Sequence, residues 1–388
     1  MEVPMQLTTT EVLVVGAGPV GLATAVTLAS KGVDVAVVDR IADGANTSRA
    51  AVIHAHTLEV LEAIGVAEPL AAQGIRTRRF TIRDRDRILV PVSFDNLPTR
   101  FPYALLVSQA VTEAVLLKRL VALGGRVLRP FEVVGLTQDE AGCVVTLADG
   151  EAVRARFVVG ADGMRSTVRR LAGIGFGGES DRGETFTLAD VEVESALPRD
   201  EVALFFSNAG LMVWAPLPDG TVRIVANVDN PPESPSIHYI QVLLNARGPA
   251  RSHSTVRRVV WGSRFRVHHR VADTFRSGSV LLAGDAGHVH SPAGGQGMNL
   301  GLHDAVALGR ALSEVLRGGP ESILDEYAAA RRPVAKDVLK FTARLTRLAT
   351  VSPPVRPLRN ALLRSAAALP AFRRRLAWRL SGLVYRRP

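Results

Sequence analysis

The sequence of 388 residues contains only one cysteine, Cys143, so it can form no intramolecular disulfide and no iron–sulfur or multi-cysteine metal site. It has no uncharged apolar run of about 18 residues or more, which argues against a transmembrane helix. Its first residues lack the basic stretch and apolar core of a secretory signal. We therefore expect a protein without a membrane span, located in the cytoplasm.

Acidic residues are absent from the C-terminal region. Residues 338–388 hold one lysine, eleven arginines and no Asp or Glu, which gives them a charge of +12 and leaves residues 1–337 at −2 of the net +10. The arginines are interspersed with Leu, Ala and Phe, as on the solvated face of amphipathic helices. Because a basic patch alone supplies only unspecific attraction to polyanions, we expect neither a nucleic-acid partner nor membrane binding.

The strand and helix patterns that are present divide the chain into regions. Residues 11–15 and 33–38 are β-branched runs that enclose a helix predicted for 19–31, a βαβ unit that opens a parallel sheet. After residue 173, alternating strands predict an antiparallel sheet, at 185–193, 201–207, 210–216 and 221–228. A buried strand at 279–284 and a helix near 299–316 follow, and the remainder is helical with a break at Pro353-Pro354.

The predicted fold class is therefore α/β, with a Rossmann-like nucleotide-binding domain, an antiparallel-sheet substrate domain that interrupts it, and C-terminal helices. We assign residues 1–74, 100–172 and 276–318 to the nucleotide-binding domain. Residues 75–99 and 173–275 are assigned to the substrate domain, and residues 319–388 to the C-terminal helical region.

The first motif, Gly16-Ala-Gly18-Pro-Val-Gly21, follows the first strand directly and opens the first helix. Gly16 permits the tight turn, Gly18 lets the backbone approach a pyrophosphate, and Gly21 lets helix and strand pack closely. Asp39 ends the second strand 18 residues after Gly21, where an acid can accept hydrogen bonds from a ribose hydroxyl. Strand, helix and acid together predict a dinucleotide site.

Two further motifs also follow strands. In Gly160-Ala-Asp162-Gly163-Met-Arg165-Ser166 the Asp and Ser, taken alone, fit ordinary helix caps. Gly284-Asp285-Ala-Gly287-His288 runs on to the loop Ser291-Pro292-Ala-Gly-Gly295-Gln296-Gly297-Met298-Asn299. An acid at a strand end can hold a polyol hydroxyl, and this loop offers backbone N–H groups and a helix N-terminus to developing negative charge. So specific a run is hard to explain by folding alone.

In order and spacing, the three motifs resemble those of FAD-dependent aromatic hydroxylases, over nearly the whole chain. These are single-component flavoprotein monooxygenases, similar to para-hydroxybenzoate hydroxylase and to polyketide-tailoring hydroxylases. Ser48-Arg49-Ala50 resembles the family's segment near the FAD phosphates, and Gln109, followed by Glu113, its flavin-contacting glutamine. The sequence departs from the family at His56, Gly287 and Arg310, where Arg, Ala and an aromatic-plus-lysine pattern are frequent.

The resemblance also implies roles for the later motifs. It gives Asp162-Gly163 contacts with FAD and NAD(P)H, gives Asp285 the ribityl chain, and places the loop 292–299 against the isoalloxazine. The cofactor-binding candidates are Gly16, Gly18, Pro19, Gly21, Asp39, Arg40, Arg49, Gln109, Asp162, Gly163, Asp285, Pro292, Gly295, Gly297, Met298 and Asn299. The flavin-facing loop is represented by Pro292, Gly295, Gln296 and Gly297, no catalytic side chain is assigned, and no metal is expected.

The implied activity is that of a monooxygenase with noncovalent FAD and with NADPH or NADH as co-substrate. A flavin hydroperoxide would hydroxylate an electron-rich aromatic or polyketide-type molecule of secondary metabolite biosynthesis. The partners would be this small molecule and molecular oxygen, in a monomer or homodimer. Epoxidation, Baeyer–Villiger insertion or oxidative rearrangement on the same fold is the alternative. A non-catalytic flavin-binding protein is a remote one, because the run 284–299 would then have no purpose.

The remaining conspicuous side chains are predicted to be structural. His288 and His290 form an HxH pair without a third ligand, which favours structural hydrogen bonding over metal binding. His268 and His269 lie in one strand, where adjacent side chains face opposite ways. The aromatic and sulfur-containing residues of the strands are expected to be mostly core residues; they are Cys143, Phe205, Phe206, Met212 and Trp214.

Overall fold

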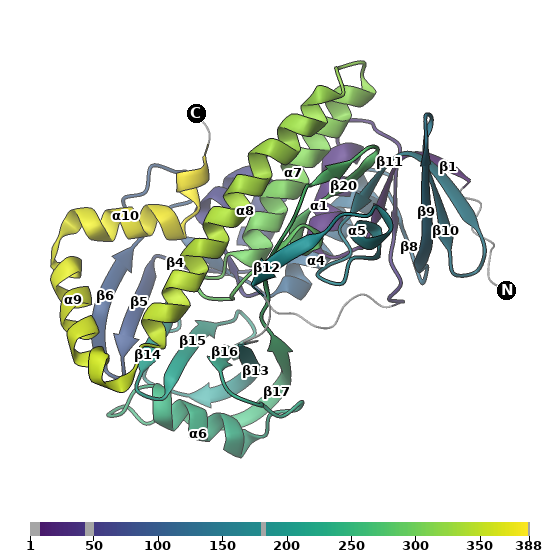
Figure 1. The fold of residues 1–388 in the computed structure, drawn as a ribbon. Helices are drawn as coiled ribbons and strands as arrows, with labels where there is room; N and C mark the ends of the chain where they lie inside the picture. Colours follow the sequence, from purple (N-terminus) through teal and green to yellow (C-terminus); the bar gives the residue numbers. More distant parts are fainter. Residues whose placement is uncertain (1–7, 43–49, 180–183, 387–388) are drawn as a thin grey trace.

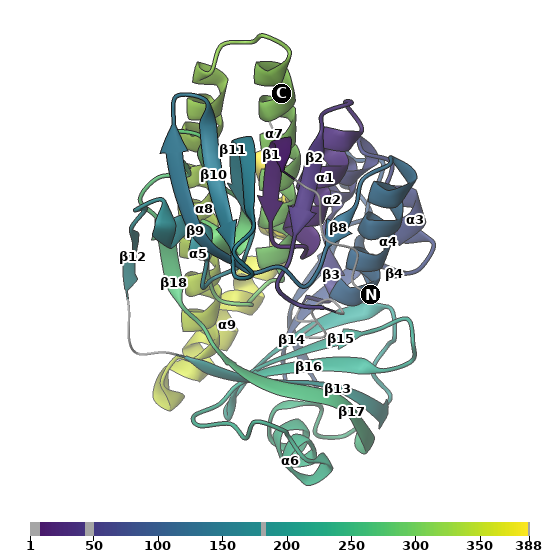
Figure 2. The same ribbon diagram turned by 90° about the vertical axis from the view of Figure 1, so that its right-hand side faces the viewer.

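A computed structural model of the chain describes residues 8–42, 50–179 and 184–386. It contains two large sheets, with helices packed against the first and the helix labelled α6 (Ile237–Arg247) on the far side of the second (Figure 1). Turned by a quarter, the molecule has the first sheet above and the second below, with the C-terminal helices running along both (Figure 2).

The first sheet is built from the predicted βαβ unit. Its strand order is β19-β20-β11-β1-β2-β8, and β20, β11, β1, β2 and β8 run parallel. The bounds are β1 (Thr9–Val15), β2 (Val35–Val38), β8 (Val127–Leu128), β9 (Val133–Asp139), β10 (Gly142–Leu147), β11 (Ala152–Gly160), β19 (Arg276–Ser277) and β20 (Val280–Leu282). Strands β10 and β9 extend β11 antiparallel. The apolar runs of these strands are buried throughout, which is typical of parallel strands.

Helix α1 (Pro19–Ala29) packs between α7 (Gly297–Leu316) and α4 (Gln109–Ala122). Two glycines of α7 permit this approach. A Cβ on Gly301 would lie 2.6 Å from Val20, and one on Gly309 would lie 2.7 Å from Thr27. The first helix ends at Ala29, two residues earlier than predicted, and Gly32 closes the turn with a φ of +75°.

The second sheet has the order β17-β13-β16-β15-β14-β5-β6 and is antiparallel except between β14 and β5. The bounds are β5 (Arg79–Asp84), β6 (Arg87–Ser93), β13 (Thr185–Glu194), β14 (Glu201–Ser207), β15 (Gly210–Pro216), β16 (Val222–Asn227) and β17 (Thr255–Arg266). One face packs on α6 (Ile237–Arg247) through Phe205, Met212 and Trp214. Phe206 lies on the other face, and Cys143 is buried in β10, so these residues are core as predicted.

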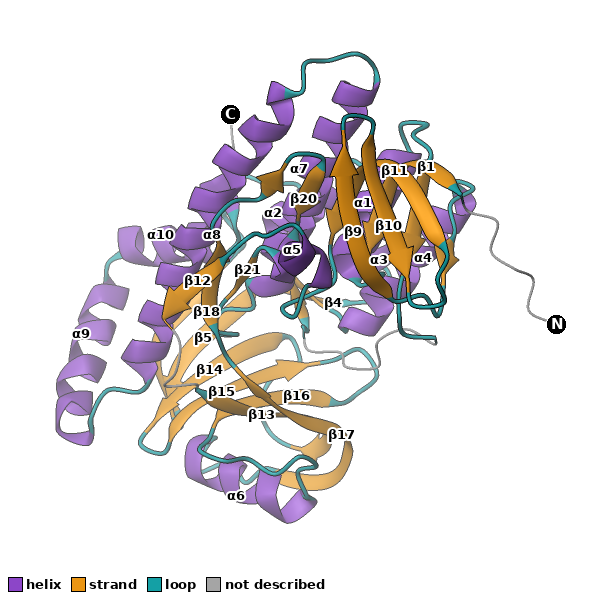
Figure 3. Cartoon of the chain, turned by 45° about the vertical axis from the view of Figure 1, so that its right-hand side comes forward, coloured by secondary structure: helices purple, strands orange, loops and turns teal. Residues whose placement is uncertain are grey.

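Smaller elements connect the two sheets. Two three-stranded sheets consist of β3 (Val52–Ile53), β7 (Ala104–Leu106) and β4 (Ile75–Thr77), and of β12 (Phe176–Glu179), β18 (His269–Ala272) and β21 (His288–Val289). The short helices are α2 (Ala55–Glu62), α3 (Ala67–Ala71) and α5 (Thr167–Leu171), and a 3-10 turn covers Gly284–Ala286. Figure 3 shows β12 and β18 crossing between the sheets.

The C-terminal region is helical, with α8 (Ser322–Ala349), α9 (Arg356–Ala368) and α10 (Pro370–Leu380). Helix α8 packs on α7, while α9 and α10 pack on β6 of the second sheet. The break predicted at Pro353-Pro354 is a 3-10 turn. Among the helices of the described ranges, none is both long and apolar enough to cross a bilayer.

Candidate functional site

A cavity of about 700 Å³ is lined by residues of both large sheets. Of the predicted site residues, those that line it are Gly16, Gly18, Pro19, Asp39, Arg40, Gln109, Asp162, Gly163, Asp285, Pro292, Gly295, Gln296, Gly297 and Met298. Gly21 and Asn299 lie behind this lining, and Arg49 lies outside the described residues. The three motifs, far apart in the sequence, therefore meet at one cavity.

The glycines of the first motif differ in what surrounds them. A Cβ on Gly16 would lie 2.4 Å from the Ala161 carbonyl oxygen, and one on Gly21 would lie 1.8 Å from the Gly16 carbonyl oxygen. A Cβ on Gly18 would meet nothing within 4 Å, so this position faces open space beside the N-terminus of α1. Two glycines are thus required by packing, and the third leaves room for a ligand.

Asp39 fastens this glycine turn to the end of β2. Its Oδ2 accepts a hydrogen bond from the Ala17 backbone N–H at 2.6 Å, and its Oδ1 accepts one from the Ile41 N–H at 2.8 Å. A carboxylate has further lone pairs, which can accept ribose hydroxyls. Gln109, at the start of α4, donates to Glu113 at 2.9 Å.

Asp162 performs the capping role that its sequence context suggested. Its Oδ2 accepts from the Thr167 and Val168 N–H groups at 2.7 and 3.1 Å, while Ser166 Oγ accepts from Arg169 N–H at 2.9 Å. The second oxygen, Oδ1, is buried and has no hydrogen-bond partner among the described residues. Burial raises the pKa of this carboxyl above its ordinary value. A buried acceptor without a partner favours a ligand at this turn.

The loop 292–298 is held by side chains that point away from its cavity face. Asn299 Nδ2 donates to Val52 O at 2.8 Å and to Gly295 O at 2.7 Å, and Asn299 Oδ1 accepts from His54 N–H at 2.8 Å. Gln296 Nε2 donates to Leu380 O at 3.1 Å. These bonds fix the loop and leave the backbone of Gly295 and Gly297 as part of the cavity wall.

A buried charged network lies behind the turn that carries Asp285. Asp304 Oδ2 accepts from His288 Nε2 at 2.5 Å and from Gly284 N–H at 3.3 Å, and its Oδ1 accepts from Arg331 Nε at 2.6 Å. Burial raises the pKa of Asp304, but Arg331 and His288 outweigh this and hold it below its ordinary value. His288 is therefore structural, as predicted. Neither Asp304 nor Arg331 was predicted from the sequence.

Two further histidines support the loop. His54 Nε2 is 2.9 Å from Gly294 O, and His290 Nδ1 is 2.9 Å from Ser291 O, so each donates from this nitrogen. Burial lowers the pKa of His54 to about 4, and burial likewise lowers the pKa of His290 to about 4. Both imidazoles are therefore neutral near pH 7.

The second sheet supplies an apolar wall. Its apolar lining residues alternate with those that contact α6, and they are Phe80, Leu188, Val202, Leu204, Val213, Ala215, Val225 and Phe265. Val267, which follows β17, and the arginines Arg79, Arg223 and Arg266 also line the cavity. The acidic residues that line the cavity in the described part of the chain are Asp39, Glu132, Asp162 and Asp285, all on the side of the first sheet. The wall can therefore hold an aromatic molecule without offering it a carboxylate.

Arg223 is a buried cation within this wall, and it was not predicted from the sequence. Its guanidinium donates to both oxygens of Asp190 at 2.7 Å, and its Nη1 donates to Ala50 O at 2.8 Å. It thereby connects β16 to the segment that precedes β3. The sequence pattern that could have predicted this pair is an arginine, Arg223, at an inward position of one alternating strand and an acid, Asp190, at an inward position of the neighbouring strand.

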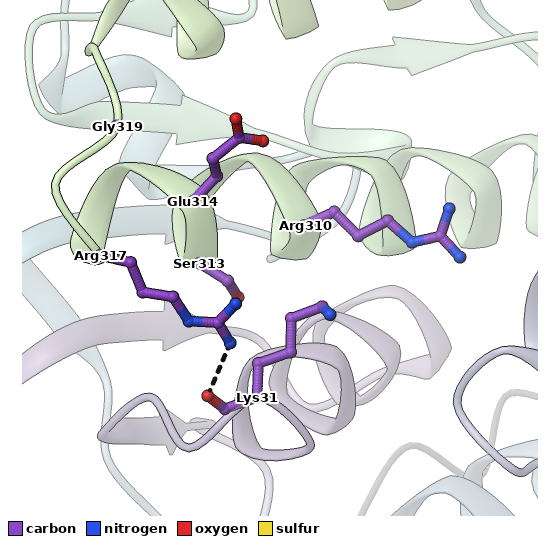
Figure 4. Close-up of a pocket in the computed structure, with 6 residues that line it drawn as sticks. All are labelled: Lys31, Arg310, Ser313, Glu314, Arg317 and Gly319. Carbon is purple, nitrogen blue, oxygen red and sulfur yellow. Dashed lines mark hydrogen bonds between the residues drawn. The ribbon is translucent and has the colours of Figure 1, made fainter.

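A second pocket of about 460 Å³ lies where α1 and α7 end (Figure 4). Its lining residues are Lys31, Arg310, Ser313, Glu314, Arg317 and Gly319. Arg317 Nη2 donates to Lys31 O at 3.0 Å, which joins the two helix ends. Because Arg310, the lining residue nearest to the loop 292–298 along α7, lies about 20 Å along the helix axis from Gly297, this pocket is not part of the motif-lined site.

Comparison with known proteins agrees with the fold and the motifs. The sequence model described as FAD binding domain matches residues 9–342, so the chain belongs to this family. Among curated proteins, it is 37% identical to a rifampicin monooxygenase of Streptomyces venezuelae over 90% of this chain and 74% of that one. It is 38% identical to a 6-methylpretetramide 4-monooxygenase of Streptomyces rimosus, over 90% of this chain and 64% of that one.

A solved structure indicates the same class of protein, the flavin-dependent monooxygenases. The crystal structure of p-nitrophenol 4-monooxygenase from Pseudomonas putida superimposes with a TM-score of 0.88 at 26% identity, covering 98% of this chain and 100% of that one. The chain is thus an FAD-dependent monooxygenase with the fold of the aromatic hydroxylases, as the sequence resemblance predicted.

Proposed function

We propose that this chain hydroxylates an electron-rich aromatic or polyketide-type small molecule, with FAD bound noncovalently, NADPH or NADH as the reductant and molecular oxygen as the oxygen source. The observation that carries the proposal is the single cavity that runs from the glycine turn, past Asp285 and the loop 292–298, to an apolar wall. The names of the relatives, which include monooxygenases of rifampicin, 6-methylpretetramide and p-nitrophenol, support the substrate class.

The residues on the side of the first sheet fit FAD. Open space at Gly18 beside the α1 N-terminus suits a pyrophosphate, since backbone N–H groups and the helix dipole favour an anion. Asp39 would hold the adenosine ribose, and Asp285, exposed in the cavity wall, would hold the ribityl hydroxyls. The partnerless Oδ1 of Asp162 gives the second motif an acceptor for the same ligand or for the nicotinamide cofactor.

When bound, FAD would supply the redox chemistry, accepting a hydride and activating O2 so that one oxygen atom reaches the substrate. The chain itself binds and orients. Its apolar wall would place an aromatic ring against the loop 292–298 and exclude water from the reacting centre. Because no acidic residue of the second sheet lines the cavity in the described part of the chain, activation of the ring would come from the substrate's own electron-donating groups, next to the neutral His54 and His290.

The test is a product analysis with the purified, FAD-loaded protein. Phenols, quinones and polycyclic aromatics are incubated with NADPH or NADH under ¹⁸O₂. We expect one labelled oxygen atom per product molecule and, for the best substrate, one NAD(P)H consumed per product. A ring-expanded product would show Baeyer–Villiger insertion instead of hydroxylation, and an epoxide would show epoxidation. If every compound yields only hydrogen peroxide, the proposal is wrong. Denaturation should release free FAD, because pigment that stays on the unfolded chain would contradict noncovalent binding.

A further inference from the structure

Exposed hydrophobic side chains are concentrated in the C-terminal helices. Of the fourteen large hydrophobic residues that are exposed in the described ranges, seven lie between residues 348 and 384. These are Leu348, Val355, Leu358, Leu362, Leu369, Trp378 and Val384. Scattered single exposed residues need no explanation, but such a concentration in about a tenth of the chain marks an interaction surface.

Helix α9 exposes leucines to solvent and buries an arginine. Leu358, Leu362 and Leu369, spaced along one side, are 61%, 61% and 62% exposed. On the inward side Arg359 is 4% exposed, and its guanidinium donates to the carbonyl oxygens of Phe206 and Leu348 at 2.9 Å. The helix is thus attached through Arg359 together with Leu363 and Ala367, which pack on the core, and it presents Leu358 and Leu362 outward.

The position of α9 leaves this leucine face uncovered. The helix packs on β6 and lies at the outer edge of the molecule, next to α10 (Figures 1 and 3). Exposed arginines of the same two helices include Arg364 of α9 and Arg374 and Arg375 of α10. Residues 338–388 as a whole carry +12 without one acidic residue.

The positive charge of residues 338–388 indicates what kind of partner binds the leucine face of α9. A second copy would bring the same arginines against these, which is repulsive. A membrane surface rich in anionic lipid offers phosphates to the arginines and an apolar layer just beneath them to the leucines. We propose that α9 and the first turns of α10 dock on an anionic membrane surface, with the leucines inserted and the arginines at the headgroups.

The experiment is flotation of the full-length, FAD-loaded protein with lipid vesicles. We expect it to float with vesicles of phosphatidylcholine and phosphatidylglycerol, not with phosphatidylcholine alone, and to be released as salt is raised. The double variant Leu358→Ser/Leu362→Ser should lower the partition coefficient at least about tenfold. Arg374→Gln/Arg375→Gln should lower it by roughly tenfold as well.

The matched control is Val121→Ser, because Val121 is 60% exposed on α4, away from α9, and its loss should leave flotation unchanged. The proposal is wrong if the wild type does not float with anionic vesicles at low salt, or if the leucine variant floats as well as the wild type. It is also wrong if light scattering shows a dimer that the leucine variant dissociates, since the occupant would then be a second copy. None of these outcomes depends on oxygenation of any substrate.

Discussion

The two sides of the cavity are built by different means. On the side of the first sheet, the lining consists of tight turns and acids that come directly after strands, as at Gly16, Asp162 and Asp285. On the side of the second sheet, it consists of aliphatic side chains such as Leu204 and Val213 that alternate along neighbouring strands. A turn can be recognised from a few adjacent residues, whereas a wall exists only after seven strands have paired. We expect the first side to control the cofactor and the second to control the substrate.

The largest effect should come from the glycines of the first side. Gly21→Ala places a Cβ 1.8 Å from the Gly16 carbonyl oxygen, so β1 and α1 must separate. We expect a loss of about 3 kcal/mol or more in the free energy of unfolding, or failure to accumulate folded protein. Gly18→Ala is the matched control, because its Cβ meets open space. It should unfold like the wild type without cofactor and yet bind FAD more weakly; equal stability of the two variants would contradict the packing argument.

Acid should weaken the support of the loop between the two sides. Folded His54 has a pKa of about 4 against an ordinary value of 6.5, so it stays neutral while the unfolded chain takes up a proton. Its contribution to stability is complete above pH 6.5 and is lost as the pH falls toward 4, about 2 kcal/mol of it between pH 7 and pH 5. Urea unfolding at the two pH values should show a smaller loss for His54→Gln than for the wild type. The exposed His253→Gln should behave as the wild type, and equal losses in all three proteins would exclude the assignment.

The third variant removes one acid from the first side. Asp285→Ala should weaken FAD binding by roughly ten- to hundredfold, because a lost charge-assisted hydrogen bond costs about 1.5–3 kcal/mol. Its fold should persist, since the side chain is exposed in the cavity wall. Fluorescence titration of the protein without cofactor measures the affinity, and thermal unfolding checks the fold. An unchanged FAD affinity would remove Asp285 from the site.

The difference between the two sides of the cavity also explains which features could be predicted from the sequence. The βαβ unit and the strands β13, β14, β15 and β16 of the second sheet were predicted to within about two residues, because hydrophobic periodicity and turn residues are local signals. Strands β5 and β6 of the same sheet were not predicted. Asp304, Arg331 and Arg223 were missed, because each acts through partners distant in the chain, as in the contact of Asp304 with Arg331. Asn299, proposed from the motif as a cofactor contact, has its side chain in the support of the loop. The domain boundaries and the cofactor roles of individual residues stay predictions.

A substitution at Gly297 tests the loop that lies between the cofactor side and the substrate side of the cavity. Gly297 begins α7, and a Cβ there would meet nothing nearer than His290 Cε1 at 4.0 Å, so the protein itself can accommodate Gly297→Val. The added side chain would instead occupy space where the flavin ring is proposed to lie. We expect a several-fold drop in product formed per NAD(P)H oxidised, with the difference recovered as hydrogen peroxide, because water exclusion and positioning control the outcome. The ratio is measured at equal FAD occupancy, and a wild-type value would show that the loop does not shape the oxygenation site.

The smallest effect should come from a single polar group in the apolar wall. Val213→Thr keeps the shape of a side chain that lines the cavity between Leu204 of β14 and Val225 of β16. It places a hydroxyl against an apolar substrate, which costs about 1 kcal/mol, so KM for the best substrate should rise about fivefold. The affinity for FAD and the product formed per NAD(P)H should not change, because no residue of the first side is altered. Val260→Thr, on an exposed position of β17, is the control and should leave KM unchanged. If Val213→Thr weakens FAD as strongly as Asp285→Ala does, the cavity is not divided into a cofactor side and a substrate side.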